Sequence, residues 1–372
     1  MKSILAGMPP AVFLRDYWQK QPLLVRQAFP RFRGIIGRDR FLSLATRPDA
    51  RSRLIIHHPR RRSDRWERHD GPFGGLDAGM LPPSHWTLLV NGIESLVPGG
   101  WQVLRAFSMI PAARIDDLMV SYAADGGTVG AHDDLYDVFL LQGPGRRRWQ
   151  ISTQRDRSVE PGDMLYLPPG IAHQGVAEGP CFTYSIGFLA PSHGELVQSF
   201  FEYLGAALGA RIDPDARYKD PDLRPPREAM ELGDAMVARV AAVIADASET
   251  HGNWVAAERA TVADFLGRLL TRPRARHVFR RPARPMSEEE LARGLRRRGK
   301  LALALPSRGL VRGGRIFFNG EAHRLRGEML RVFKELVKER EIALPLAARN
   351  DRAVALLHEW YVAGYLRVDG PG

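Results

Sequence analysis

The chain has 372 residues, a length that predicts two or three domains. Hydrophobic residues are 44% and charged residues 26% of the chain, and no apolar run approaches the roughly 18–20 residues of a membrane-spanning helix. With no small-residue cleavage site near the N-terminus, the sequence predicts neither a membrane protein nor a signal peptide. The net charge of +12 would attract nucleic acid, although arginine spread along the whole chain fits a general compositional preference equally well.

The chain has one cysteine, Cys181, so it cannot form an intrachain disulfide or a thiolate metal cluster. This usage favours a reducing, cytoplasmic location. Any metal site must then be built from His, Asp or Glu side chains.

Residues 1–100 read as an N-terminal α/β part. Residues 13–26 suggest a short helix followed by an apolar extended piece, and residues 51–77, rich in Arg, His, Asp and Gly, are predicted to form surface loops.

Residues 101–212 read as an all-β core. Short apolar or alternating runs are separated by closely spaced turns rich in Gly, Pro and Asp, and no segment of helical period interrupts them before residue 190. This pattern is typical of a β-sandwich or barrel and disfavours a parallel α/β sheet. The runs are residues 118–122, 136–142, 148–152, 164–168 and 182–189.

After Gly194 the hydrophobic period becomes helical, over residues 195–208, 228–247 and 254–270, and we predict a helical segment spanning residues 213–285. Residues 286–372 read as a winged-helix-like domain. It begins with a capping box at Ser287, contains a hairpin with Asn319-Gly320 at its turn, and has helices at about 326–338 and 351–363.

A candidate metal site lies in the β-rich part. His132 and Asp134 are two residues apart, so in a strand their side chains would point the same way. His173 follows a Pro-Pro-Gly turn 39 residues after Asp134 (173 − 134), far enough for the chain to wrap a barrel and return. Two His and one carboxylate form a facial triad, which leaves coordination positions open for a co-substrate and O₂.

Two further groups are candidates for binding. Arg147 shares its strand face with Trp149, which predicts that its guanidinium points inward and needs an anionic partner. The distal carboxylate of 2-oxoglutarate would supply that partner. Asp117, Met119 and Ser121 share another strand face, where a carboxylate near the metal suits a cationic substrate group.

These residues resemble the JmjC-type ribosomal oxygenases of the cupin superfamily, specifically the bacterial group that hydroxylates arginine in ribosomal proteins. The resemblance is clear over roughly residues 10–225, and the remainder resembles the family in layout. The matching pieces are residues 16–23, 115–121, 129–139, 142–149, 161–170 and 184–188.

The resemblance implies a double-stranded β-helix core of the jelly-roll, cupin type, with N-terminal helices, a helical dimerisation segment and a C-terminal winged-helix-like domain. It implies Fe(II) at His132, Asp134 and His173, with 2-oxoglutarate and O₂ as co-substrates. It also implies a homodimer that hydroxylates an arginine of a large-subunit ribosomal protein. The remaining implied roles are co-substrate binding by Arg147 and Ser121, and substrate binding by Asp117, Met119, Tyr136 and Ser185.

Two features depart from the family pattern. The stretch between Trp149 and Pro161 is short, and Ala123 stands where a small hydroxyl residue is expected. Three alternatives therefore stay open: a JmjC-type protein demethylase, another cupin metal enzyme that does not use 2-oxoglutarate, and a nucleic-acid-binding regulator that works through the C-terminal domain.

Overall fold

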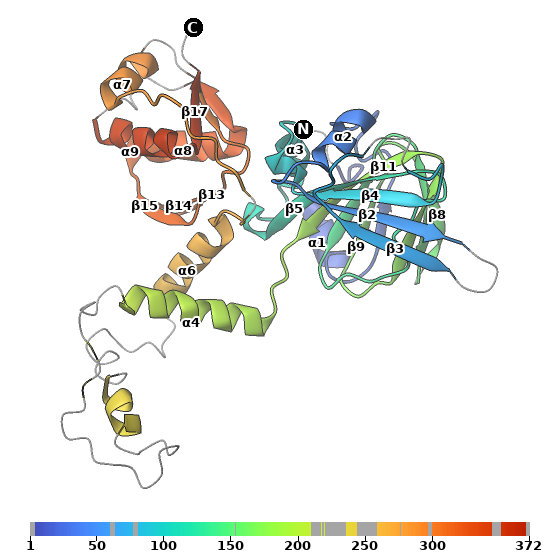
Figure 1. The fold of residues 1–372 in the computed structure, drawn as a ribbon, viewed down its shortest axis with the longest axis horizontal. Helices are drawn as coiled ribbons and strands as arrows, with labels where there is room; N and C mark the ends of the chain where they lie inside the picture. The colour runs from blue at the N-terminus through green and yellow to red at the C-terminus, as the bar shows by residue number, and fades with distance from the viewer. Residues whose placement is uncertain are drawn as a thin grey trace. The chain divides into compact units, whose positions relative to one another are not determined.

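The computed structural model describes most of the chain (Figure 1). The described residues are 4–59, 64–76, 81–152, 154–209, 217, 219, 236–243, 259–275, 277–296, 300–343 and 351–369. They divide into two compact units, Met1–Ala190 with Thr271–Gly372, and Pro191–Leu270. No helix among the described residues is both long enough and apolar enough to cross a membrane.

The first unit is built on an eight-stranded sheet with the order β1-β9-β6-β11-β5-β4-β2-β3 (Figure 1). Every pairing in this sheet is antiparallel. Its strands are β1 (Leu23–Val25), β2 (Arg51–His58), β3 (Arg65–Asp70), β4 (Trp86–Asn91), β5 (Ile115–Ala123), β6 (Val138–Gln142), β9 (Met164–Leu167) and β11 (Cys181–Phe188).

A three-stranded antiparallel sheet faces the large one, in the order β10-β7-β8. Its strands are β7 (Arg146–Ile151), β8 (Gln154–Val159) and β10 (His173–Glu178). Trp149 and Ile151 of the small sheet share one buried cluster with Val138, Leu140 and other residues of the large sheet. The interior of a double-stranded β-helix therefore lies between the two sheets, as predicted.

Short helices cover the outer face of the large sheet. They are α1 (Pro10–Asp16), α2 (Arg38–Leu44) and α3 (Gly100–Arg105), with two single turns, η1 (Ile93–Ser95) and η2 (Ala112–Arg114). Phe13, Phe41 and Leu104 from the three helices join the main hydrophobic cluster with Phe139 and Tyr184 of the strands. The strands β4, β6, β9 and β11 of this sheet thus bury both faces, which explains their nearly continuous apolar runs.

The prediction of surface loops over residues 51–77 is wrong. Residues 51–58 form β2 and residues 65–70 form β3, a hairpin that extends the large sheet at its edge. The charged side chains that suggested loops are compatible with a strand there because most of β3 is exposed on both faces.

The second unit contains α4 (His193–Gly209) and most of α6 (Arg259–Thr271). The two helices contact each other through Phe200 and Phe265, whose ring centroids are 5.3 Å apart, and through a 2.8 Å hydrogen bond from the Tyr203 hydroxyl to Asp264. Residues 236–243 are also helical, within the predicted helix at 228–247. Residues 228–235, 244–247 and 254–258 lie outside the described part.

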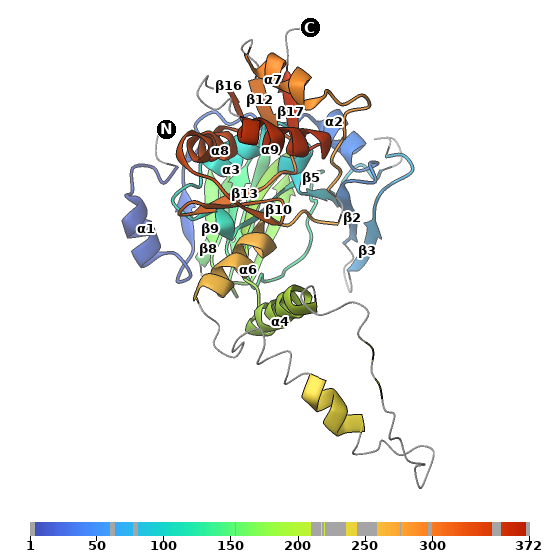
Figure 2. The same cartoon turned by 90° about the vertical axis from the view of Figure 1, so that its left-hand side faces the viewer.

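The C-terminal part of the first unit contains helices and short strands (Figures 1 and 2). It has its own hydrophobic core, which includes Trp360 and Phe333. The predicted capping box is present, with reciprocal hydrogen bonds between Ser287 and Glu290. The Asn319-Gly320 turn is present too, with both residues at positive φ, as a two-residue hairpin turn requires. The elements are α7 (Glu288–Arg296), β12 (Lys300–Leu303), β13 (Gly309–Arg312), β14 (Arg315–Phe318), β15 (Glu321–Arg324), α8 (Gly327–Glu339), β16 (Glu341–Ala343), α9 (Asp351–Val362) and β17 (Leu366–Asp369).

Candidate active site

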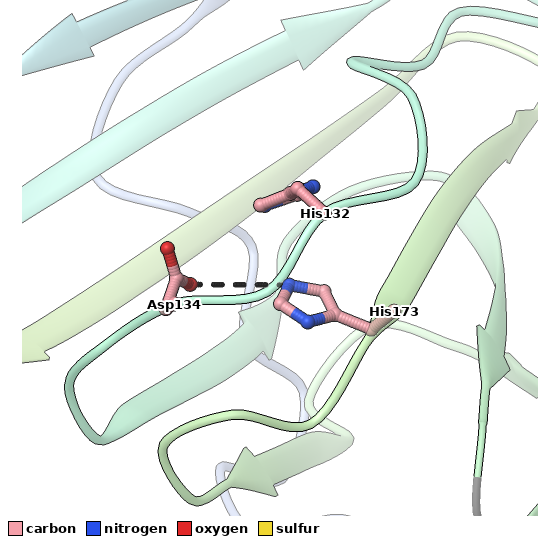
Figure 3. A group of neighbouring side chains, drawn as sticks. All are labelled: His132, Asp134 and His173. Atoms are coloured by element: carbon pink, nitrogen blue, oxygen red, sulfur yellow. Dashed lines mark ion pairs between the residues drawn. The ribbon is translucent and has the colours of Figure 1, made fainter.

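His132, Asp134 and His173 converge at one end of the barrel (Figure 3). One potential ligand atom from each lies within 4.8 Å of those of the other two, and His173 Nε2 is 3.9 Å from Asp134 Oδ2. His173 is buried, Asp134 is half-buried and His132 is exposed. The group is therefore open to solvent on the His132 side, which suits a metal with vacant positions.

The local structure around this group differs from the prediction. The prediction placed His132 and Asp134 on one face of a strand, but residues 124–137 connect β5 to β6 without forming a strand. His132 makes an isolated antiparallel bridge with His173, through backbone hydrogen bonds of 3.1 and 2.8 Å. The backbone oxygen of Asp134 accepts a 2.8 Å hydrogen bond from Gly170 in the Pro-Pro-Gly turn. The convergence thus comes from backbone pairing and not from strand alternation.

Both imidazoles are oriented by backbone carbonyls. Nδ1 of His132 lies 3.1 Å from the Gly130 oxygen, and Nδ1 of His173 lies 2.9 Å from the Ile171 oxygen. A carbonyl only accepts, so each Nδ1 carries the proton and Nε2 keeps its lone pair for a metal. Burial lowers the pKa of His173, which favours the same neutral form.

The far end of the connecting segment is held at Asp137. This carboxylate is fully buried and accepts a 2.6 Å hydrogen bond from the Tyr166 hydroxyl and a 3.0 Å hydrogen bond from the Gln19 amide. The Tyr166 hydroxyl in turn accepts a 2.8 Å bond from the Gln19 backbone N–H. We call Gln19, Asp137 and Tyr166 the Asp137 clamp. It links the N-terminal residues 16–23 to residues 129–139, which contain two of the metal-site residues. The sequence analysis did not predict this link.

Arg147 points into the barrel, as predicted from its position on the same strand face as Trp149. The strand alternates regularly, with Arg146, Arg148 and Gln150 exposed, and Arg147 is only 3% exposed. Its guanidinium lies 3.7 Å from Cys181 Sγ and 5.7 Å from the centre of the Trp149 ring. Its Nε has no hydrogen-bond partner among the described residues. A buried cation with an unused donor fits an anionic ligand.

Two polar residues that the sequence analysis did not single out for binding, Trp149 and Thr183, are buried in the barrel strands. The indole N–H of Trp149 is buried without a partner in the described chain, and its ring lies 5.8 Å from that of His173. Thr183 pairs with Ser121 across β11 and β5, so two buried hydroxyls share one face. A Cβ on Gly175 would come within 2.9 Å of both Trp149 and Arg147, so only glycine fits there. The donor set thus suits a small dicarboxylate.

Asp117 is buried on β5 and is held from one side. Its Oδ2 accepts hydrogen bonds of 3.0 Å from the Asn91 amide and 3.1 Å from the Gly92 N–H. Burial raises the pKa of Asp117 and the charge of Asp116 raises it further, while Asn91 and the charge of Arg274 lower it. No hydrogen bond within the described chain reaches Oδ1, so one carboxylate oxygen remains for a ligand.

The other predicted substrate residues lie close by. Met119 pairs with Ser185 across β5 and β11. A Cβ on Gly187 would lie 3.8 Å from Asp117 Oδ1 and 3.7 Å from the Tyr136 ring, so these two groups flank the same point. Burial and the charge of Asp134 raise the pKa of Tyr136, which stays a neutral hydroxyl.

Exposed apolar side chains surround this end of the barrel. Leu135 is 82% exposed and Tyr136 is 41% exposed, and both directly follow Asp134. Trp66 of β3, also 41% exposed, packs near Gly130, where a Cβ would meet its ring at 3.4 Å. Exposed apolar groups beside a polar site indicate contact with a partner larger than a small metabolite.

Two known domain families match parts of this chain. Residues 102–159 and 152–196 match the JmjC domain family, and residues 244–367 match the ROXA-like winged helix. The barrel and the His–Asp–His group thus coincide with a JmjC domain, and the C-terminal core with a winged helix. The double-stranded β-helix with a winged-helix-like C-terminal domain, as predicted, is confirmed.

The particular similarity is to ribosomal oxygenases. The chain is 36% identical over 237 residues to the ribosomal protein uL16 3-hydroxylase of Escherichia coli, covering 58% of this chain and 60% of that protein. It is 37% identical over 238 residues to a probable ribosomal oxygenase of Haemophilus influenzae, covering 58% and 56%. The aligned region thus spans under two thirds of these relatives.

Solved structures extend the likeness over the whole chain. The E. coli ribosomal oxygenase YcfD superposes with a TM-score of 0.78 at 27% identity, covering 98% of this chain and 99% of that one. A second structure of YcfD, in complex with cobalt and 2-oxoglutarate, gives the same values. The predicted resemblance to the JmjC-type ribosomal oxygenases is therefore confirmed.

Proposed function

We propose that this protein is an iron(II)- and 2-oxoglutarate-dependent oxygenase that hydroxylates an arginine side chain of a large-subunit ribosomal protein. The observation that carries the proposal is the open His132–Asp134–His173 group in the same barrel as the buried, incompletely bonded guanidinium of Arg147. The names of the relatives support it, because one is a hydroxylase of ribosomal protein uL16 and another was solved with cobalt and 2-oxoglutarate.

The residues present fit the two absent groups. Two neutral imidazoles and one carboxylate are the donor set of non-haem iron(II) oxygenases. Arg147, Ser121 and Thr183 would hold the distal carboxylate of 2-oxoglutarate. When bound, iron and 2-oxoglutarate would activate O₂, one oxygen atom of which enters the substrate and the other the succinate product.

The protein's own residues would position the substrate. Asp117 offers one free carboxylate oxygen to a guanidinium, and Met119, Tyr136 and Ser185 would line its path. The exposed Leu135, Tyr136 and Trp66 would contact the polypeptide on either side of the target residue.

Mass spectrometry of ribosomal proteins tests this proposal. Cells with and without the gene are compared, and one large-subunit protein should gain a single oxygen atom on arginine only when the gene is present. Complementation by an Asp134→Asn variant should fail, because the metal site loses its carboxylate. Absence of the mass gain in every ribosomal protein would overturn the proposal.

The same measurement separates the alternatives. A demethylase would remove the mass of a methylene group from lysine or arginine instead of adding oxygen. A cupin enzyme without 2-oxoglutarate would be insensitive to loss of Arg147. A nucleic-acid-binding regulator would leave the ribosomal proteins unchanged and would bind DNA with a strong dependence on salt.

We also propose that the protein forms a homodimer through the Pro191–Leu270 unit, in the cytoplasm. The support is that α4 leaves large apolar side chains in solvent, since Val197 is 55% and Phe201 is 64% exposed. Residues Met236, Val237, Val240 and Val243 are likewise between 41% and 62% exposed. Such faces are usually covered by another chain.

A further inference from the structure

A cluster of four charged side chains, of which Glu94 is buried and Asp116 and Arg274 are partly exposed, joins the barrel to the C-terminal part of the first unit. Glu94 of η1 is fully buried, and its carboxylate lies 3.4 Å from the guanidinium of Arg308. The guanidinium of Arg274 pairs with Asp116. Arg308 and Arg274 also donate to the backbone oxygen of Asp116, at 2.5 and 2.6 Å. Both cations come from sequence beyond residue 270, and both acids come from sequence before residue 120.

This cluster surrounds Asp117 on the side away from the barrel. Asp116 precedes it in β5, and Glu94 accepts a 3.0 Å hydrogen bond from the backbone N–H of Leu118, which follows it. The guanidinium groups of Arg274 and Arg308 thus contact Asp116, the residue next to Asp117 in the chain. Arg308 also contacts Glu94, which holds the peptide group of Leu118. The two guanidinium groups fix the backbone that carries the predicted substrate carboxylate.

The cluster also sets the charge around Asp117. The titratable and charged groups that interact with it are Glu94, Asp116, Tyr136, Arg274 and Arg308. His277 interacts with the two arginines. Arg340 lies further away, where it donates to the carbonyl oxygens of Ala304, Leu305 and Ser307. Three carboxyl groups this close would repel one another and favour protonation unless cations stood beside them.

We propose that Arg274 and Arg308 are positioning residues of the substrate subsite, which keep Asp117 ionised and oriented for a cationic side chain. The inference rests on the proposed function and deepens it. It gives the C-terminal part a role in substrate recognition that requires no contact between that part and the substrate.

The pKa of both buried carboxyl groups lies above its usual value because of burial, and the two cations oppose that shift. Burial and the charge of Asp117 raise the pKa of Glu94, and Arg308 lowers it. Burial and Asp116 raise the pKa of Asp117, and Arg274 is the cation that lowers it. Removing either cation should therefore raise the pKa of a carboxyl group in the cluster, and a protonated Asp117 binds a guanidinium poorly.

The experiment compares Arg274→Met and Arg308→Met with a matched control, Arg105→Met. Arg105 forms a 2.8 Å ion pair with Glu339 that also joins the two parts but lies outside the cluster. The side chains of Arg105 and Arg274 are exposed almost equally, at 36% and 37%. The control thus measures any loss that comes only from weaker docking of the two parts.

In Arg274→Met and Arg308→Met we expect a higher KM for an arginine peptide of uL16 at pH values below the raised pKa of Asp117. The rise should be about tenfold for each pH unit by which that pKa increases. The acidic limb of the kcat/KM profile should move to higher pH in Arg274→Met and Arg308→Met, with rescue by Arg308→Lys and no movement in Arg105→Met. Glu94→Gln should move the limb to lower pH, opposite to the cation variants, because it removes a negative charge. A peptide with citrulline, the neutral isostere, should bind all variants equally.

A second measurement does not need turnover. The carboxyl groups of Glu94 and Asp117 are titrated by ¹³C NMR in the unmodified protein and in the variants, with Glu94→Gln and Asp117→Asn for assignment. Unmoved titrations in both arginine variants, or equal effects of Arg105→Met, would overturn the inference. If uL16 is not hydroxylated at all, the proposed function fails, and the NMR titrations still decide the role of the two arginines.

Discussion

At the scale of single residues, Arg147 is informative because its burial is costly without a ligand. Removing one partner of a buried, hydrogen-bonded charge pair costs roughly 2–5 kcal/mol. We therefore expect Arg147→Met to lower kcat/KM for 2-oxoglutarate by about 100-fold or more, measured by succinate formation. The free energy of unfolding of the ligand-free variant, measured with urea, should be no lower than that of the unmodified protein, since the change removes an incompletely bonded buried cation.

Arg148→Met is the matched control for this prediction. Arg148 is the next residue of β7, but its side chain is exposed. Among the described residues it forms one ion pair, with Glu178 at 4.0 Å. Its removal should leave 2-oxoglutarate turnover unchanged. If Arg147→Met and Arg148→Met lost 2-oxoglutarate turnover equally, general positive charge near the barrel would matter and not the inward guanidinium of Arg147.

His277 should make stability depend on pH. Burial, together with the charges of Arg308 and Arg274, lowers the pKa of His277 to about 4. The folded protein thus holds this imidazole neutral while the unfolded chain protonates it near pH 6.5. Its contribution to stability is present above pH 6.5 and is lost as the pH falls towards 4. Urea unfolding at pH 7.5 and 5 should show a smaller difference in His277→Asn than in the unmodified protein, and an equal difference would contradict this.

At the scale of elements, α4 is the clearest candidate for contact with a second copy. We expect Phe201→Glu to weaken or abolish the dimer, because it places a charge in the apolar face that we propose to be covered. Sedimentation velocity would measure the change. Gln198→Lys, which also alters the charge of an exposed position on α4, is the control and should leave the dimer intact. A monomer in the unmodified protein at all concentrations would refute the proposal.

Some elements were predictable because their signals are local. The Ser287 capping box and the Asn319-Gly320 turn depend on a few neighbouring residues, and both are present. The β2–β3 hairpin was missed because an exposed edge strand carries charged side chains and therefore looks like a loop. The domain boundaries predicted at residues 100, 212 and 285 stay predictions.

The candidate site was predictable in its residues but not in its construction. Alternation along β7 correctly oriented Arg147, since that strand is regular. The alternation of side chains along a strand also led us to group His132 with Asp134, but for the wrong reason. Their segment is not a strand and is held by a bridge from His132 to His173. Contacts between distant segments, such as Gln19 with Asp137 or Arg308 with Glu94, leave no local pattern, so the sequence did not indicate them.

At the scale of the whole molecule, the net charge of +12 bears on the form in which the proposed ribosomal substrate would be bound. Proteins that bind RNA are themselves basic, so a free ribosomal protein would be repelled, whereas one already bound to ribosomal RNA sits in a strongly negative field. We expect kcat/KM for a ribosomal particle to exceed that for the free protein at low salt. The advantage should disappear by about 0.3 M salt, where charges are screened within several ångströms. Equal salt dependence for the two substrates would contradict this prediction.

The Asp137 clamp has a consequence for how the protein would keep a metal ion. Gln19 holds the end of the segment that presents two of the three candidate metal-binding side chains, yet it lies more than a hundred residues before them. Metal retention would then be sensitive to events at the N-terminus, such as cleavage by a protease or the pull of a partner on residues 10–20. Either event would loosen the loop and weaken the hold on the ion, so that activity would be lost through a change far from the site in the chain.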